Sequence, residues 1–413
     1  MLMPPAPTQR TTWRTPAVIV VCGCLIGMMT FGPRSTLGFF LTPLSQAHGW
    51  GRDVFALAIA VQNLLWGVGQ PFAGALADRY GANRVLSVGA LLYAAGLVMM
   101  AYATNAAVLE LSAGFLIGFG LSGCAFTIVL GAFGKLLPEN WRSLAFGAGT
   151  AAGSFGQFLY SPVAVMLMGV VGWQETLVIF GASLLVVLPL SLALATERGA
   201  APAPTAGPPT QSLRQALAEA FGHRSYVLLV LGFFTCGFQL AFITVHLPSY
   251  LIDRGLSNQV GGWTLAIIGI FNIIGSLAAG WLGNRMPKRY ILSAIYFFRA
   301  LAVVAFISVP ASPIATYLFG AVTGLLWLST VPPTSALVAL MFGTRWMTTL
   351  FGFAFFSHQV GGFLGVWLGG IAFDRTGSYN SVWWLSVLFG LLSAVINLPI
   401  VEKPVARQAA VAV

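Results

Sequence analysis

Residues 74–84 read GALADRYGANR, a short charged segment between two long apolar runs at about 53–77 and 84–104. Each run reaches the roughly 20 apolar residues that a helix needs to cross the hydrocarbon core of a bilayer. A loop this short joins two antiparallel helices that lie side by side. The stretch therefore predicts a helical hairpin in a membrane.

The composition extends this prediction to the whole chain. Of its 413 residues, 58% are hydrophobic and only 7% are charged, whereas soluble domains carry roughly a quarter charged residues. We therefore predict an all-α membrane protein with 12 transmembrane helices. The other ten spans are expected at about 16–43, 108–134, 143–170, 174–195, 225–252, 260–284, 289–308, 314–342, 347–372 and 381–400.

The net charge of +10 does not indicate nucleic-acid binding, because the basic residues recur in short loops and form no patch. The first 15 residues lead into a full-length span, so we expect no cleavable signal peptide. The cysteines all fall inside apolar runs without metal-ligand spacing, which favours buried thiols and no metal site. They are Cys22, Cys24, Cys124 and Cys236.

The distribution of Lys and Arg predicts the orientation. With the N-terminus cytoplasmic, fifteen of the 20 basic residues fall on the inside and three on the outside, as the positive-inside rule requires. The outside set is Arg52, Arg254 and Arg375. We expect a multi-pass protein of a bacterial inner membrane with both termini in the cytoplasm.

The two halves of the sequence resemble each other. Leu57-Ala-Ile recurs as Leu265-Ala-Ile, and the 74–79 loop recurs at 280–285 with asparagine in place of aspartate. We predict two pseudo-symmetric six-helix bundles around a central cavity, at 1–195 and 225–413. A cytoplasmic linker at 196–224 begins Pro/Ala/Thr-rich and ends in a short amphipathic helix at about 213–221.

The 74–84 loop resembles the signature loop of the major facilitator superfamily, G-x-L-x-D-R-x-G-x-R/K, in letters and in position. The resemblance implies transport by alternating access. It also implies that this loop is a gating element that holds the outward-facing state. The residues that match are Gly74, Asp78, Arg79, Gly81 and Arg84.

Within that superfamily the chain resembles the monocarboxylate-porter and oxalate/formate-exchanger branch. The similarity rests on Gly32-Pro-Arg34-Ser and on the stretch from Gly361-Gly362 to Asp374. The resemblance implies an arginine on span 8. This sequence has none there and carries Arg299 on span 9 instead.

No acidic residue falls in the middle of a predicted span, which counts against a carrier of organic cations. Arg34, by contrast, lies in the outer half of span 1, where an arginine exposed to lipid costs about 3 kcal/mol. We expect it to face the cavity and to bind a carboxylate with its planar fork. The alternative is that Arg34 reaches the outer headgroups. Pseudo-symmetry places Gln239 of span 7 in the same region.

Other polar residues at membrane depth complete the candidate site. His358 is a candidate proton carrier or anion ligand, because imidazole titrates near neutral pH, and His246 is a weaker candidate of the same kind. The alternative for each histidine is a hydrogen bond between helices. Arg299 contacts either the substrate or a helix-end carbonyl. The neutral candidates are Asn63, Gln157, Gln359 and Tyr160.

These residues favour a secondary transporter of a small organic anion, with Arg34 as the anion ligand. The main alternative is an efflux pump for neutral or amphipathic compounds. A receptor or enzyme on a carrier-like scaffold is a third hypothesis, but no catalytic motif stands in a loop. We expect a monomer without cofactors whose partners are its cargo and membrane lipid, and proton coupling is left open.

Overall fold

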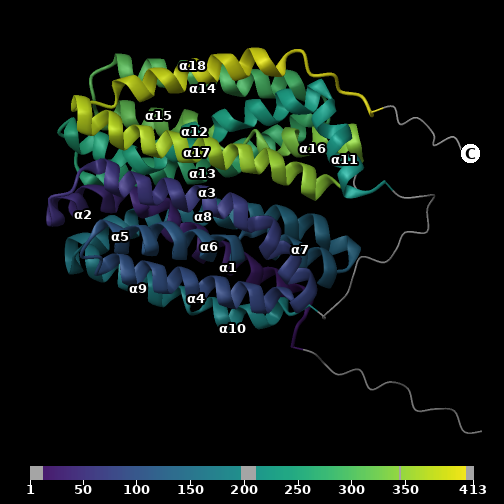
Figure 1. The fold of residues 1–413 in the computed structure, drawn as a ribbon, viewed down its shortest axis with the longest axis horizontal. Helices are drawn as coiled ribbons and strands as arrows, with labels where there is room; N and C mark the ends of the chain where they lie inside the picture. The colour runs from purple at the N-terminus through teal and green to yellow at the C-terminus, as the bar shows by residue number, and fades with distance from the viewer. Residues whose placement is uncertain (1–12, 197–210, 344–345, 406–413) are drawn as a thin grey trace, which may run out of the picture.

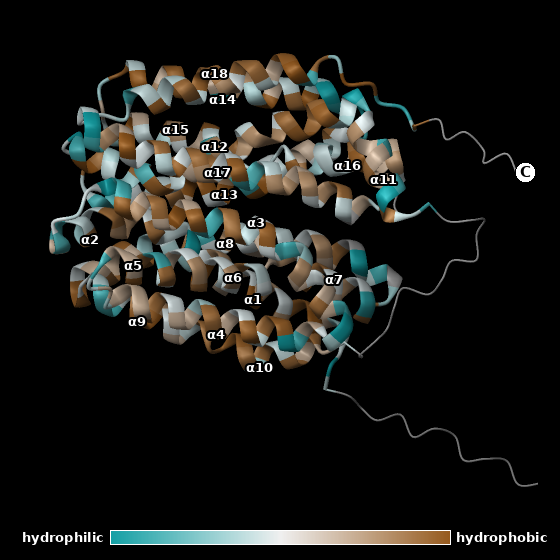
Figure 2. Cartoon of the chain, in the orientation of Figure 1, coloured by the Kyte–Doolittle hydropathy of each residue, from teal (hydrophilic) through white to brown (hydrophobic). Residues whose placement is uncertain are grey.

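The computed structural model describes residues 13–196, 211–343 and 346–405. Four basic residues of the predicted cytoplasmic set, Arg10, Arg198, Arg345 and Arg407, lie outside the described residues, as does the Pro/Ala/Thr part of the linker. Twelve segments of the described chain are long and apolar enough to cross a membrane, as predicted. Figure 1 shows them roughly aligned, and Figure 2 shows hydrophilic residues gathered toward the helix ends.

The first six spans form the N-half, by which we mean residues 13–196. Span 1 extends to His48, past the predicted end near residue 43. A 3₁₀ turn at Leu37–Phe40 within this span places three apolar side chains in the core. The helices of this half are α1 (Pro16–Thr36), α2 (Leu41–His48), α3 (Arg52–Tyr80), α4 (Ala82–Ala101), α5 (Ala106–Leu109), a π-helical segment (Glu110–Leu116), α6 (Ile117–Gly123), α7 (Phe126–Leu136), α8 (Glu139–Val171), α9 (Trp173–Leu184), α10 (Val187–Ser191) and a 3₁₀ turn (Leu192–Leu194).

The last six spans belong to the C-half, by which we mean residues 211–343 and 346–405, and a short helix precedes these spans. That helix has the predicted place, and its Ser212 and Gln215 form a capping box. The helices are α11 (Leu213–Gly222), α12 (Arg224–Asp253), α13 (Asn258–Gly283), α14 (Lys288–Ser308), α15 (Pro313–Leu326), α16 (Val331–Phe342), α17 (Met347–Thr376) and α18 (Asn380–Asn397).

Helix pairing repeats from one half to the other. The first and fifth spans pack together in the N-half (α1 with α8), and the seventh and eleventh do so in the C-half (α12 with α17). The third and sixth spans pair as α4 with α9, and the ninth and twelfth as α14 with α18. The halves meet mainly along α3 with α17 and along α8 with α13. The internal symmetry relates these two contacts to each other.

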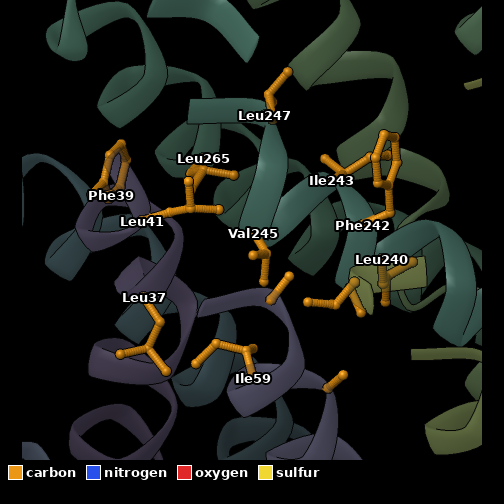
Figure 3. Packing of buried hydrophobic residues seen from close by; sticks show 14 of the residues in the cluster. Leu37, Phe39, Leu41, Ile59, Leu240, Phe242, Ile243, Val245, Leu247 and Leu265 are labelled. Carbon is orange, nitrogen blue, oxygen red and sulfur yellow. The ribbon is translucent and has the colours of Figure 1, made fainter. Parts of the chain in front are cut away.

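Close backbone approach explains the glycines on α12 and α17. A Cβ atom on Gly237 would overlap the carbonyl oxygen of His358, and one on Gly361 would overlap that of Phe234. Small residues let membrane helices pack at this distance, where dispersion contacts replace the hydrophobic effect. The apolar core continues across the two halves, where Leu37 and Ile59 lie near Val245 of α12 (Figure 3).

Span 10 is discontinuous between α15 and α16, at residues 327–330. Pro332 lacks a backbone N–H, so the Leu328 carbonyl has no α-helical donor and accepts from the Val331 N–H at 2.9 Å instead. The Leu328 N–H donates to the Asn272 side chain at 2.9 Å. Irregular backbone at membrane depth is stable only where other groups of the protein satisfy it.

Candidate functional site

Arg34 lies between the two halves. Its Nη2 donates to Asn63 Oδ1 at 2.6 Å, and its Cζ stands 4.7 Å from the centre of the Trp66 ring. Asn63 and Trp66 are one helical turn apart on α3, on the face that packs against α17. A Cβ atom on Gly362 of α17 would stand 3.6 Å from Asn63. The guanidinium therefore faces α17 from within the N-half, and not the headgroups.

Several hydrogen-bond donors around Arg34 have no partner. The buried atoms are Arg34 Nε, Trp66 Nε1 and Gln359 Nε2, together with the hydroxyl of Tyr93. Tyr93 is fully buried. Buried polar groups in proteins are nearly always hydrogen-bonded. A donor-rich site of this kind is complementary to a ligand that brings acceptor oxygens.

His358 reaches this site through a row of aromatic rings. Its ring is parallel to Phe355, with centroids 5.6 Å apart, and Phe355 meets the edge of Trp66 at 5.5 Å. His358 Nδ1 lies 3.2 Å from Gln359 Oε1. The structure thus joins Arg34 and Asn63 directly, and Gln359 lies against Gly67 of α3. His358 is separated from Arg34 by the Phe355 and Trp66 rings. None of the described contacts of Arg34 is with a carboxylate.

Gln239 and His246 do not join this group. Gln239 turns toward α18, where its Nε2 donates to the Ser386 carbonyl at 3.0 Å. His246 is buried inside the C-half, with Nε2 2.8 Å from the Val366 carbonyl. Gln239 therefore does not face the Arg34 region as pseudo-symmetry predicted, because α12 packs against both α17 and α18.

Arg299 contacts helix-end carbonyls, one of the two roles that the sequence allowed. Its Nε donates to the Leu326 carbonyl at 2.9 Å, and its Nη2 donates to the carbonyls of Leu326 and Trp327. These oxygens lie at the break in span 10. Arg299 therefore replaces missing helical hydrogen bonds and does not reach the Arg34 region.

Gln157 and Tyr160 lie on α8. Gln157 Nε2 donates across the halves to the Leu265 carbonyl at 3.2 Å. Tyr160 packs within the N-half, against Gly32 and against Phe180 with ring centroids 5.3 Å apart. Both residues serve packing between helices in this conformation.

The signature loop lies at the opposite end of α3 from Arg52. Asp78 Oδ1 accepts from Lys135 Nζ at 2.5 Å, within the N-half, and Arg84 donates to the Tyr80 carbonyl at 3.4 Å. Gly81 has a φ of +95°, which L side chains rarely adopt. Arg79 lies over the Tyr80 ring, and a Cβ atom on Gly74 would meet nothing within 4 Å.

A gate at the Arg52 end of the helices was not predicted. Arg52 of the N-half binds Asp253 of the C-half through Nη1 and Nη2, each at 2.7 Å. Its Nη1 also donates to the Tyr379 hydroxyl at 2.8 Å, and its Cζ stacks 3.7 Å from the Phe373 ring centre. Burial raises the pKa of Tyr379 to about 12, so this hydroxyl stays protonated at neutral pH.

A second contact of this gate involves backbone. The carboxylate of Asp374, at the end of α17, accepts from the backbone N–H of Arg52 at 3.0 Å and of Asp53 at 2.7 Å. The N-terminus of α3 has no side-chain cap of its own. Asp374 therefore caps this helix end from the other half. Thr42 and Ser249 add a hydroxyl pair at 2.9 Å. We call these six residues, Thr42, Arg52, Ser249, Asp253, Asp374 and Tyr379, the Arg52 gate.

Hydrogen bonds between the halves extend from the Arg52 end into the middle of the helices. Beyond the Arg52 gate, Gln157 donates to the Leu265 carbonyl, and Asn272 donates to Ser154 at 2.8 Å. The two halves are thus joined at the Arg52 end. The signal in the sequence was the opposite charges at the ends of spans 2, 7 and 11.

The model of the Major Facilitator Superfamily matches residues 23–366. An uncharacterized MFS-type transporter of Bacillus subtilis, YcxA, is 29% identical over 93% of this chain and 94% of its own length. Monocarboxylate transporter 11 of Mus musculus is 25% identical, covering 88% of this chain and 82% of the relative. Monocarboxylate transporter 13 of Rattus norvegicus is 26% identical over 88% and 84%.

Solved transporters share the fold. A bacterial homolog of the human lysosomal transporter Spinster, in an inward-facing and unoccupied conformation, superposes with a TM-score of 0.77 at 14% identity. The match covers 94% of this chain and 96% of that one. A D-xylose-proton symporter superposes with a TM-score of 0.69 at 16% identity, over 95% and 98%.

Proposed function

This chain belongs to the Major Facilitator Superfamily, and from that premise we propose that it is a secondary transporter of a small monocarboxylate that works by alternating access. The observation that carries the proposal is the set of unpartnered donors around Arg34, with no carboxylate in contact. A bound carboxylate supplies the missing acceptors and neutralises the guanidinium. The relatives named as monocarboxylate transporters support the same cargo class.

The site also supports a cargo with an apolar body. Trp66 and Phe355 stand beside the guanidinium, so a carboxylate that reaches Arg34 places its hydrocarbon part against aromatic rings. His358 and Gln359 complete the proposed site from the C-half. In this assignment Arg34 and Asn63 hold the anion, and the rings select its body.

We further propose that both termini lie in the cytoplasm of a bacterial cell and that the protein sits in the inner membrane. Eleven described basic residues at the Asp78 end support this orientation. They are Arg14, Arg79, Arg84, Lys135, Arg142, Arg214, Arg224, Arg285, Lys288, Arg289 and Lys403. In this orientation the Arg52 gate is the outer gate, and it is closed in the described conformation.

The test is uptake of radiolabelled pyruvate and benzoate into proteoliposomes that contain the purified protein. Loss of a charge-assisted bidentate contact costs roughly 3 kcal/mol, so Arg34→Gln is expected to lower uptake about a hundredfold. Arg34→Lys keeps the charge but not the fork, and is expected to recover only part of the activity. Arg254→Gln, which removes a cation away from the site, is the matched control.

Two results separate the alternatives. If Arg34→Gln folds normally and transports both carboxylates at the wild-type rate, the site assignment is wrong. If the wild type moves neither carboxylate but expels neutral aromatic compounds, the efflux alternative is supported instead.

A further inference from the structure

Two polar residues that lie away from the Arg34 site, Gln239 and Arg299, line the same small cavity in the C-half. They belong to α12 and α14, and they are 2% and 3% exposed. A water-sized sphere can place its centre within about 10 Å³ of this cavity, which is about the room that one water molecule needs. The rest of the cavity wall is formed by Leu240, Ile243, Val303, Thr323 and Trp327.

Each of these two side chains keeps one buried polar atom without a hydrogen bond. The Arg299 guanidinium donates through Nε and Nη2 to carbonyls at the break in span 10, and its Nη1 has no partner. The Gln239 amide donates through Nε2 to the Ser386 carbonyl of α18, and its Oε1 has no partner. One of these atoms is a donor and the other is an acceptor. Buried polar atoms rarely stay unpaired, least of all at membrane depth, because bulk water cannot supply the missing bond.

A water molecule is complementary to this pair of atoms, because it accepts and donates hydrogen bonds at the same time. Its oxygen can accept from Arg299 Nη1, and one of its hydrogens can be donated to Gln239 Oε1. A chloride ion would neutralise the guanidinium, but it is larger than a water molecule and would face the partial negative charge of the amide oxygen. The size of the cavity and the donor–acceptor pair on its wall therefore favour water.

We propose that this cavity is a water-binding site, in which one ordered water molecule joins Arg299 to Gln239. The water completes a polar chain inside the C-half. The chain starts at the carbonyls of the break in span 10, passes through Arg299, the water and Gln239, and ends at the Ser386 carbonyl. It thereby ties the broken span to α14, α12 and α18. The proposal is independent of the cargo, because it concerns the interior of one half and not the Arg34 site.

The direct test is a crystal structure of the full-length protein at a resolution that shows ordered water. The expected result is one density peak within hydrogen-bonding distance of both Arg299 Nη1 and Gln239 Oε1. A second crystal is grown with bromide in place of chloride, because bromide scatters anomalously and water does not. The peak is expected to be present in both crystals and to carry no anomalous signal.

Three crystallographic results overturn the proposal. The first is a cavity without density between well-ordered Gln239 and Arg299 side chains. The second is a direct hydrogen bond between these two side chains. The third is an anomalous bromide peak in the cavity, which would identify an anion site. Each of them leaves the carboxylate-uptake test of the Arg34 site unaffected, so the two proposals are judged separately.

A substitution that fills the cavity gives an independent, energetic test. Val303 of the cavity wall is 2% exposed, and Val303→Ile adds one methyl group in the place of the water. Filling a dry apolar cavity stabilises a protein, whereas displacing the water leaves Arg299 Nη1 and Gln239 Oε1 unpaired. Val303→Ile is therefore expected to lower the thermal unfolding midpoint of the full-length protein by at least about 2 °C.

A double-mutant cycle separates loss of the water from simple overpacking. Gln239→Leu removes the acceptor at a similar side-chain volume, and in that background Val303→Ile is expected to be neutral or to raise the unfolding midpoint. Val304→Ile, at the next position of α14 and outside the cavity wall, is the matched control and is expected to have the same effect in both backgrounds. The proposal is wrong if Val303→Ile stabilises the parent protein or lowers both midpoints equally. If Gln239→Leu fails to fold, the crystallographic test decides.

Discussion

Replacing Arg52 with glutamine should open the Arg52 gate. The substitution removes two charge-assisted hydrogen bonds to Asp253 and one to Tyr379, along with the stacking on Phe373. All of these contacts cross between the halves. They exist only in the closed state, so their loss shifts the conformational equilibrium and leaves each half intact.

The size of the shift follows from partial burial. The side chains of Arg52 and Asp253 are 12% and 30% exposed, between the limits of a surface pair and a buried one. Exposed pairs contribute at most about 1 kcal/mol, and buried hydrogen bonds to charged groups roughly 1.5–3 kcal/mol each. We take about 2 kcal/mol for the whole contact, because water solvates Asp253 once its partner is gone. That free energy changes the open-to-closed ratio about thirtyfold.

The assay measures the distance between spin labels at Thr104→Cys and Gln259→Cys, two exposed positions at the Arg52 end of the N-half and the C-half. The full-length protein is placed in lipid nanodiscs at one fixed pH, with the half-buried Cys22 and Cys24 changed to alanine. Arg254→Gln is the matched control, because Arg254 is also a cation at this end but is exposed and lies over Tyr250 of its own half. The control is expected to change the ratio less than about twofold. If Arg52→Gln folds normally and keeps the wild-type ratio, the gate does not hold the closed state.

Two further predictions concern packing inside the C-half. Gly237→Ala is expected to lower the thermal unfolding midpoint or abolish folding, since its Cβ atom would overlap the His358 carbonyl oxygen. Overpacking of this kind costs typically 1–3 kcal/mol. Gly352→Ala, with nothing within 4 Å of the new Cβ, is the control and should be neutral or stabilising. Arg299→Lys is expected to destabilise the protein by roughly 3 kcal/mol, because an ammonium cannot replace the guanidinium that donates to the Leu326 and Trp327 carbonyls. An unchanged unfolding midpoint in calorimetry would mean that Asn272 alone stabilises the break in span 10.

Much of the architecture follows from the amino-acid sequence. A span of about 20 apolar residues has one stable form in a bilayer, because every backbone polar group must be bonded within the segment. The number of spans and the short helix after the linker therefore followed from composition and spacing. Arg34 was also predictable as a buried cation, since lipid exposure of a guanidinium is costly.

The partners of each polar side chain depended on tertiary structure. Depth in the membrane is a property of sequence position, but the direction in which a side chain points depends on how its helix is rotated against its neighbours. Gln239 and Arg34 occupy related depths, yet one faces α18 and the other α17 across the interface. Arg299 reached backbone carbonyls because span 10 breaks beside it.

The sequence by itself determined a twelve-helix membrane protein of two related halves, because the hydrophobic effect and backbone hydrogen bonding in lipid act on local segments. Only the tertiary structure decided which end is closed. Arg52 lies on a helix of the N-half, whereas Asp253 and Asp374 lie on two helices of the C-half. The Arg52 side chain binds the Asp253 carboxylate 201 residues away, and the Arg52 backbone N–H binds the Asp374 carboxylate 322 residues away. Contacts between such distant residues are encoded by packing geometry and not by any local pattern.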